Sequence, residues 1–206
     1  MSEWWTYRLS DFLMFSPRTY WRLVELYNHD VWPAQLAALA VGFAALWLAA
    51  SQRAGAGRVL VALLAAVWLW VGWAFHWQRY ATINWAAQYF AMAFAVQAVL
   101  LVGLGTLYRH TYAPPSGVAV QGLGWLLAIT GVVFYPLAGL LAGHPWTQAE
   151  VFGIAPEPTA LASLGLLLAS RYPPSRARRC LLAIIPTLAL LVGAATLWMM
   201  VDYLTQ

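Results

Sequence analysis

The chain of 206 residues is 63% hydrophobic and only 9% charged. About a quarter of the residues of a water-soluble domain are charged, and a globule of this size cannot bury so many apolar side chains, so lipid must form part of its solvent. The formal net charge of +4 comes from arginines in short segments between apolar runs. That distribution excludes the basic patch typical of a nucleic-acid partner.

Residues 1–30 form an amphipathic segment rather than a membrane span. Ser16 followed by Pro17 is typical of a helix start, because serine caps the first turn and proline has no N–H to satisfy there. In the helix that follows, the apolar face carries Tyr20, Leu23, Val24 and Tyr27, and the polar face carries Arg18, Arg22 and Glu25. This pattern predicts a helix that lies in the membrane interface or covers one end of a helical bundle.

Residues 31–206 contain six apolar stretches, which predict an all-α bundle of six transmembrane helices. The stretches are Val31–Ala50, Val59–Phe75, Ile83–Tyr108, Val118–Leu141, Thr159–Ser170 and Cys180–Leu204. A helix needs about 20 residues to cross the hydrocarbon core, so the second and fifth stretches are short. The first, third and fifth stretches begin with similar sequences, which suggests three tandem helical hairpins, although runs rich in Ala and Leu also match by chance.

The charged residues sort by sign into alternate gaps between the stretches. The gaps after the first, third and fifth stretches hold seven arginines and no acid, whereas all seven acids and the other four arginines lie elsewhere. Short positive loops stay in the cytoplasm. The pattern therefore predicts periplasmic N- and C-termini, in a multi-pass protein of a bacterial inner membrane.

Little in the sequence indicates catalysis. No charged residue lies in the middle of a stretch, which argues against a proton pump with a carboxylate at the membrane midplane. The lone Cys180 excludes an intrachain disulfide and a paired-thiol metal site. We therefore predict no catalytic residue and no metal ligand, and the cofactor remains unknown. Gln97, the deepest polar residue, forms either an interhelical hydrogen bond or a ligand contact.

A group of polar and aromatic residues on the predicted outer side provides a candidate binding site. If the hairpins pack around a common axis, these residues meet at the outer mouth of the bundle and form a pocket for a small solute or a lipid headgroup. The candidate residues are His76, Arg79, Tyr80, Asn84, Gln88, Tyr135, His144 and Glu157. Two alternatives remain open, a Zn or Cu site built on the histidines and plain anchoring in the membrane interface.

Three segments carry a resemblance to a known family. They are Phe15–Asn28 followed by Trp32-Pro-Ala-Gln, then Tyr80–Ala87, and then Tyr135–Pro145 with Phe152–Thr159. Together they resemble an uncharacterised family of small bacterial multi-pass membrane proteins, a domain of unknown function. The resemblance implies a bacterial inner-membrane protein and supplies no activity. In that family a cysteine often lies between two prolines where this chain has Glu157, so a role of that cysteine would not carry over.

Two functions remain open at this point. The first is a membrane-embedded binding or transport protein for a small solute or lipid, with its polar site at the outer mouth. The alternative is a non-catalytic subunit or scaffold of a larger membrane complex, whose small residues Ala37, Ala40 and Ala44 would pack on a partner membrane protein or a second copy. An enzyme is not favoured. The expected partners are membrane lipid, a small-molecule ligand and such a neighbouring chain.

Overall fold

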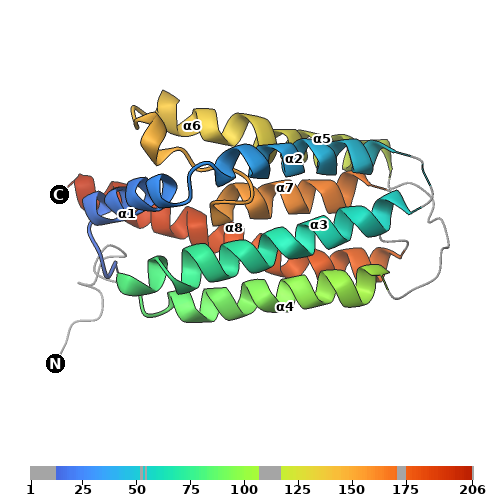
Figure 1. Ribbon diagram of the computed structural model, residues 1–206, viewed down its shortest axis with the longest axis horizontal. Coiled ribbons are helices and arrows are strands. Elements are labelled where there is room, and N and C mark those ends of the chain that lie inside the picture. Colours follow the sequence, from blue (N-terminus) through green and yellow to red (C-terminus); the bar gives the residue numbers. More distant parts are fainter. Residues whose placement is uncertain (1–12, 52, 54, 107–116, 171–174, 206) are drawn as a thin grey trace.

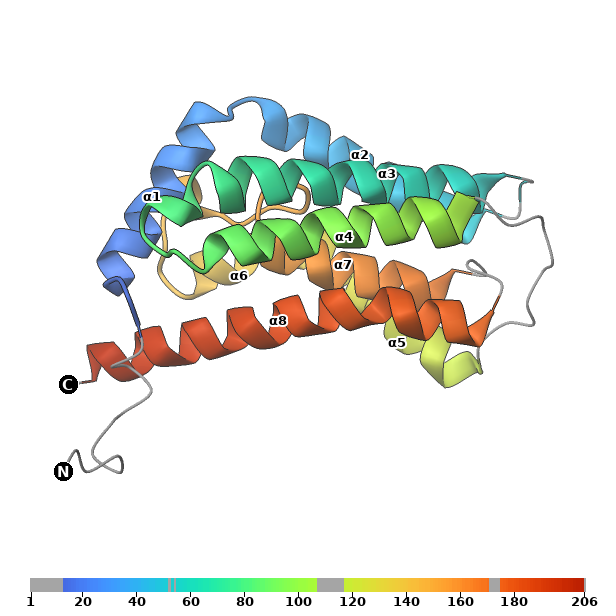
Figure 2. The same ribbon diagram turned by 90° about the horizontal axis from the view of Figure 1, so that it is seen from below.

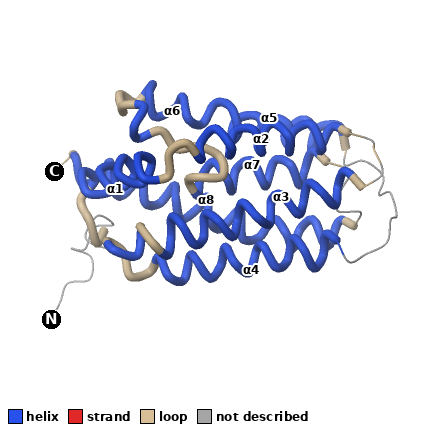
Figure 3. Tube along the Cα trace, viewed as in Figure 1, coloured by secondary structure: helices blue, strands red, loops and turns tan. Residues whose placement is uncertain are grey.

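The computed structural model describes residues 13–51, 53, 55–106, 117–170 and 175–205, and within these ranges it contains helices and no strand. Figure 3 shows that most of the described chain is helical. The α-helices are α1 (Pro17–Asp30), α2 (Ala34–Ala50), α3 (Ala56–Val71), α4 (Ala87–Thr106), α5 (Val118–Ile129), α6 (Tyr135–Leu141), α7 (Pro156–Ala169) and α8 (Arg176–Leu204). Two π-helical segments, η3 (Gly72–Trp77) and η5 (Thr130–Phe134), extend α3 and connect α5 to α6.

Most of the helices run along the long axis of the molecule, and α1 crosses one end (Figures 1 and 2). The opposite end holds the C-terminal ends of α2, α4 and α7 and the N-terminal ends of α3, α5 and α8. Successive long helices therefore alternate in direction, as the charge pattern requires. Arg53, Arg58 and Arg176 belong to the end opposite α1, whereas Arg109 and Arg171 lie outside the described residues.

Several helices are long and apolar enough to span a membrane, but fewer than the six that the sequence predicts. Within the described ranges there are four such segments, namely Ala56–Thr82, Ala87–Gly105, Val118–Leu141 and Arg176–Leu204. The pair α1 and α2, bent by 89°, provides a fifth candidate. The predicted fifth stretch corresponds to α7, whose 14 residues extend only about 21 Å. Helix α7 packs on α5 and α8 and also touches α2 and α3, so protein rather than lipid surrounds much of it.

Glycines allow α5 and α7 to pack backbone to backbone. A Cβ atom at Gly165 of α7 would lie 2.2 Å from the backbone nitrogen of Ala128, and one at Gly124 of α5 would lie 2.4 Å from that of Ala169. Both distances are shorter than any side chain permits. Small residues at such positions are the usual means by which membrane helices approach closely.

Two of the three predicted hairpins are present, α2 with α3 and α7 with α8. The predicted hairpin of α4 with α5 is wrong. Helix α2 packs on α3, and α7 packs on α8, but α4 packs chiefly on α3 and α8 while α5 packs chiefly on α7. One polar contact joins α4 to α8, because the Nε2 of the buried Gln97 donates to the carbonyl oxygen of Leu182 at 2.9 Å. This contact confirms the interhelical hydrogen bond considered for Gln97.

Helix α1 begins and packs as its sequence predicts. The Ser16 hydroxyl accepts a hydrogen bond from the backbone N–H of Thr19 at 3.2 Å, and Tyr20, Val24 and Tyr27 are buried against the bundle. Two Asn28 hydrogen bonds, from its Nδ2 to the carbonyl oxygens of Thr147 and Ala149, tie the helix to the loop between α6 and α7. Helix α1 therefore covers the bundle end where this loop and the C-terminal end of α8 also lie (Figure 1).

Candidate functional site

A cavity of about 300 Å³ lies between α4 and α8 beneath α1, and we refer to it as the α4–α8 cavity. The two helices contact each other, and Figure 2 shows them running side by side. The α8 wall extends from Ile185 to Met200 and is mostly apolar. Leu188 and Val192 on this wall are 54% and 42% exposed, so the cavity reaches the outer surface of the bundle. An elongated molecule could enter it sideways from lipid.

His76 lies at the polar end of the cavity and is 5% exposed. Among the described residues, neither of its buried ring nitrogens has a hydrogen-bond partner. Four aromatic rings surround the imidazole, those of Phe75, Tyr80, Phe90 and Phe94, with centroid distances of 4.6 to 6.0 Å. An unpaired buried polar group is unfavourable in a folded protein, which makes His76 a candidate for contact with a ligand.

The π-helical segment η3 presents His76 to the cavity. Phe75 and His76 are adjacent in sequence, and both are buried and line the cavity. The wider turn of a π-helix rotates successive side chains through a smaller angle than an α-helix does, so neighbours can share one face. Such segments occur frequently at functional sites.

Two carboxyl groups complete the polar end of the cavity. Glu150, in the loop before α7, accepts a hydrogen bond from the Tyr20 hydroxyl at 3.0 Å. Glu157 lies in the first turn of α7, which Pro156 opens and where the helix dipole favours an acid. Its Oε2 atom is buried and has no hydrogen-bond partner in the described part of the chain. Gly193 of α8 leaves the space that Glu157 occupies, since a Cβ there would lie 2.7 Å from the Glu157 Cγ.

The electrostatic environment of these groups is acidic. Burial, and then the charge of Glu157, raise the pKa of the Glu150 carboxyl well above its usual range, while the Tyr20 hydrogen bond opposes this effect. None of the described residues that line the cavity is an arginine. Within the described ranges no three His, Cys, Asp or Glu side chains gather closely enough to hold a metal ion. The polar end of the cavity is therefore rich in hydrogen-bond acceptors and lacks a permanent positive charge.

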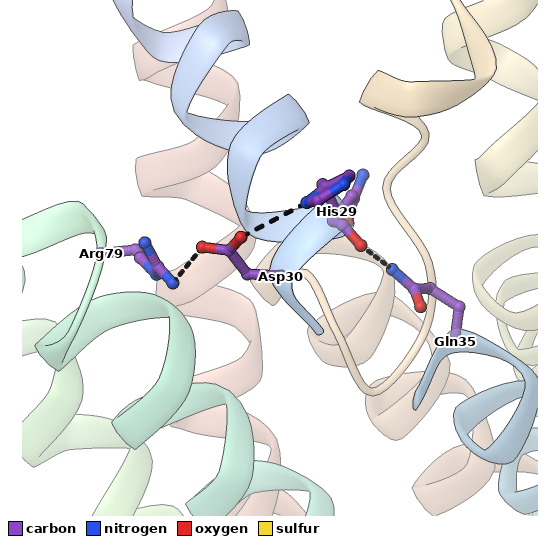
Figure 4. Close-up of polar contacts among 5 residues, drawn as sticks. His29, Asp30, Gln35 and Arg79 are labelled. Carbon is purple, nitrogen blue, oxygen red and sulfur yellow. Dashed lines mark hydrogen bonds and ion pairs between the residues drawn. The ribbon is translucent and has the colours of Figure 1, made fainter. Parts of the chain in front are cut away.

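Three of the eight predicted site residues meet in this cavity, namely His76, Tyr80 and Glu157. Arg79 lies elsewhere, as Figure 4 shows. Its guanidinium pairs with Asp30, which also contacts His29, at the elbow between α1 and α2. Gln35 closes the same elbow by donating to the carbonyl oxygen of Asn28 at 2.7 Å. The Arg79 side chain therefore positions α1, and it also borders an exposed groove outside the cavity.

The other four predicted residues also lie outside the cavity lining. The Asn84 Oδ1 accepts from the backbone N–H of Ala86 at 2.9 Å, and Gln88 is exposed. Tyr135 is half-buried. His144 lies against Trp21 with a ring-centroid distance of 4.0 Å, so it does not join His76 as the metal alternative requires.

Sequence reasoning missed several residues of the cavity. It assigned Tyr20 to the buried face of α1, but not to a site, and it left out Glu150, Gly193, Thr196 and the three phenylalanine rings around His76. The position of Glu150 near Glu157, in the same outer segment, was the one available signal. Nothing in the sequence of α8 distinguished Gly193 or Thr196 from the other small residues of that helix.

Comparisons with known proteins identify a family and no individual relative. The model of a family of unknown function, DUF6064, matches residues 18–203. No curated protein and no solved structure matches the chain.

Proposed function

The chain belongs to this family of unknown function, and from the α4–α8 cavity we propose that it is a membrane-embedded protein that binds a small solute or lipid at the outer mouth of its bundle. The observation that carries the proposal is a surface-reaching cavity whose polar end holds unpartnered atoms of His76 and Glu157. Convergent polar groups in a mostly apolar cavity are typical of a ligand site. Ionisable residues within a membrane protein are likewise typical of a functional site.

The proposal includes an orientation. We place the arginine-rich end of the bundle in the cytoplasm of a bacterium, and α1, the cavity and both termini on the periplasmic side of the inner membrane. The alternating directions of the long helices support this arrangement, because they bring the arginines of alternate gaps to one end. In this orientation, α2, α3, α4, α5 with α6, α7 and α8 make up six membrane-embedded segments. The shortest of them, α7, is enclosed by the others.

One observation favours the alternative function, a subunit or scaffold of a larger membrane complex. Ala37, Ala40 and Ala44 of α2 are exposed, and Phe43 and Trp47 on the same helix are more than half exposed. Such a face can pack on another membrane helix. The mass of the purified protein in lipid nanodiscs distinguishes the binding protein from the scaffold. A scaffold retains a second chain through purification, whereas a self-contained binding protein does not.

Cavity binding can be tested with amphiphiles that share one tail. We would measure the binding of n-octylammonium, n-octanol and n-octanoate by equilibrium dialysis against nanodiscs with and without the protein. The proposal predicts saturable binding of at least one of them. Ala189→Phe, which fills the cavity from α8, should abolish that binding, whereas Ala195→Phe on the exposed face of α8 should leave it intact. Absence of saturable binding for all three amphiphiles would refute the proposed function.

A further inference from the structure

We propose that the ligand of the α4–α8 cavity is an amphiphilic organic cation, with its ammonium head among Glu150, Glu157 and His76 and its apolar tail along α8. The inference rests on the proposed binding function and names the ligand class of the same site. It begins from the charges that face the cavity. The described lining contains two carboxyl groups and no arginine, so an anionic head would find no permanent positive charge there and would meet like charge once the carboxyl groups are ionised.

The unpartnered atoms also favour a hydrogen-bond donor. The Glu157 Oε2 is a buried acceptor without a partner, and an ammonium N–H can donate to it. One ring nitrogen of His76 can accept a second N–H, and this side chain is more than nine-tenths buried. An ammonium head therefore supplies an N–H donor to each of these two acceptors.

The aromatic rings around His76 are suited to a cation. Phe75, Tyr80, Phe90 and Phe94 each lie within 6.0 Å of the imidazole, measured between ring centroids, and all four line the cavity. A cation is attracted to the face of an aromatic ring at separations up to about 6 Å. The same rings provide no comparable attraction for a carboxylate or a phosphate.

The α8 wall provides the place for a tail. From Gly193, which lies against Glu157, the wall continues through Ala189 and Leu188 to Ile185. This path is apolar and open to the outside of the bundle along Leu188 and Val192. A linear alkyl chain can lie there while its head contacts the two carboxyl groups.

An anionic lipid headgroup has a separate place on this protein. Arg18, Arg22 and Arg79 border the exposed groove between α1 and the segment after η3. Two of them already pair with acids, Arg22 with Glu25 and Arg79 with Asp30. The arginines nearest to this end thus border the outer groove and not the cavity, which leaves the cavity to a cation.

The inference can be tested by comparing amphiphiles that have different head groups and the same alkyl tail. In the nanodisc dialysis, n-octylammonium should bind about tenfold more tightly than n-octanol, a difference equivalent to about 1.4 kcal/mol, and n-octanoate should bind most weakly. Equal or tighter binding of n-octanol or n-octanoate would overturn the inference while leaving the proposed function standing. Failure of all three to bind would overturn both.

Isosteric variants of the two cavity acids test where the head group of the ligand binds. Glu157→Gln keeps the shape of the side chain and removes its charge, so it should weaken n-octylammonium binding about tenfold and leave n-octanol binding unchanged. Glu150→Gln should act in the same direction and provides a second variant. The control is Glu25→Gln, which removes an acid that pairs with Arg22 outside the cavity. Unchanged n-octylammonium affinity in both cavity variants would overturn the inference.

Discussion

Glycines have opposite roles in the contact between α5 and α7 and beside the α4–α8 cavity. Gly124 and Gly165 bring two backbones together and leave no space. Gly193 instead makes room for a carboxylate beside an open cavity. The first region is a packed interface, and the second leaves Glu157 Oε2 and the ring nitrogens of His76 without a hydrogen-bond partner among the described residues. The difference indicates that close packing and the candidate site lie in different parts of the bundle.

The largest effect should come from disturbing the packed contact. Gly165→Val places a branched side chain where a Cβ alone would lie 2.2 Å from the Ala128 backbone nitrogen. We expect a loss of about 3 kcal/mol in the free energy of unfolding, visible as a lower midpoint of thermal denaturation in detergent. The control is Gly122→Val, at a position where an added Cβ meets no atom within 4 Å. Equal stability of the two variants would contradict the assignment of α5–α7 as the packed contact.

The glycine of the open contact should behave in the opposite way. In Gly193→Ala the new methyl group overlaps the flexible end of Glu157, which lies 2.7 to 2.8 Å away, and pushes the carboxylate out of place. We expect about a tenfold loss of n-octylammonium affinity, measured by dialysis, with little change in the thermal midpoint. If the variant lost stability and kept its affinity, Gly193 would belong to the packing of the bundle rather than to the site.

The cavity should also respond to pH with a defined sign. The pKa of Glu150 is raised by burial and by Glu157, so its carboxyl is neutral at mildly acidic pH and becomes negative as the pH rises. n-Octylammonium stays charged over this window, and its affinity should therefore increase several-fold from mildly acidic to mildly alkaline pH. Glu157, His76 and Tyr20 face the same space, so Glu150→Gln is needed to isolate the contribution of Glu150 and should make the increase with pH smaller. An affinity that fell with rising pH would contradict this assignment.

The smallest effect is expected at the hydrogen bond between Gln97 of α4 and Leu182 of α8. Gln97→Met removes the hydrogen bond to the Leu182 carbonyl and keeps a side chain of similar length. Interhelical hydrogen bonds of this kind contribute about 0.6 kcal/mol, and the variant also removes a buried Oε1 without a partner. The thermal midpoint should therefore change little and n-octylammonium affinity not at all. A large loss of affinity would show that Gln97 contacts the ligand.

The sequence predicted those features of the fold that depend on local pattern. The face of α1 followed from the spacing of Tyr20, Val24 and Tyr27, and the alternating directions of the helices agree with the distribution of the arginines. The sequence did not predict which helices pack together, because the apolar helices α4 and α5 carry no pattern that selects α3 and α7 as their neighbours. The number of six spans stays a prediction, because α7 has only 14 residues. A short helix enclosed by protein does not need the length that lipid imposes.

The candidate site was predicted in part. The sequence predicted that His76, Tyr80 and Glu157 lie at one end of the bundle, and in the structure all three line one cavity. It could not tell that Arg79 would instead pair with Asp30, because that contact depends on how sharply α1 turns into α2. The role of Gly193 depends on which residue of α7 faces it, and that is a property of packing rather than of either sequence segment.

The most direct test is to locate a bound amphiphile. We would determine the structure of the protein with 8-bromooctylammonium and record the anomalous scattering of bromine. The account predicts bromine beside Ile185 and Leu188 on the α8 wall, with the ammonium nitrogen within hydrogen-bond distance of a Glu157 carboxylate oxygen. Bromine found on the outer faces of the bundle or in the groove bordered by Arg18 and Arg22, with the cavity unfilled, would contradict it.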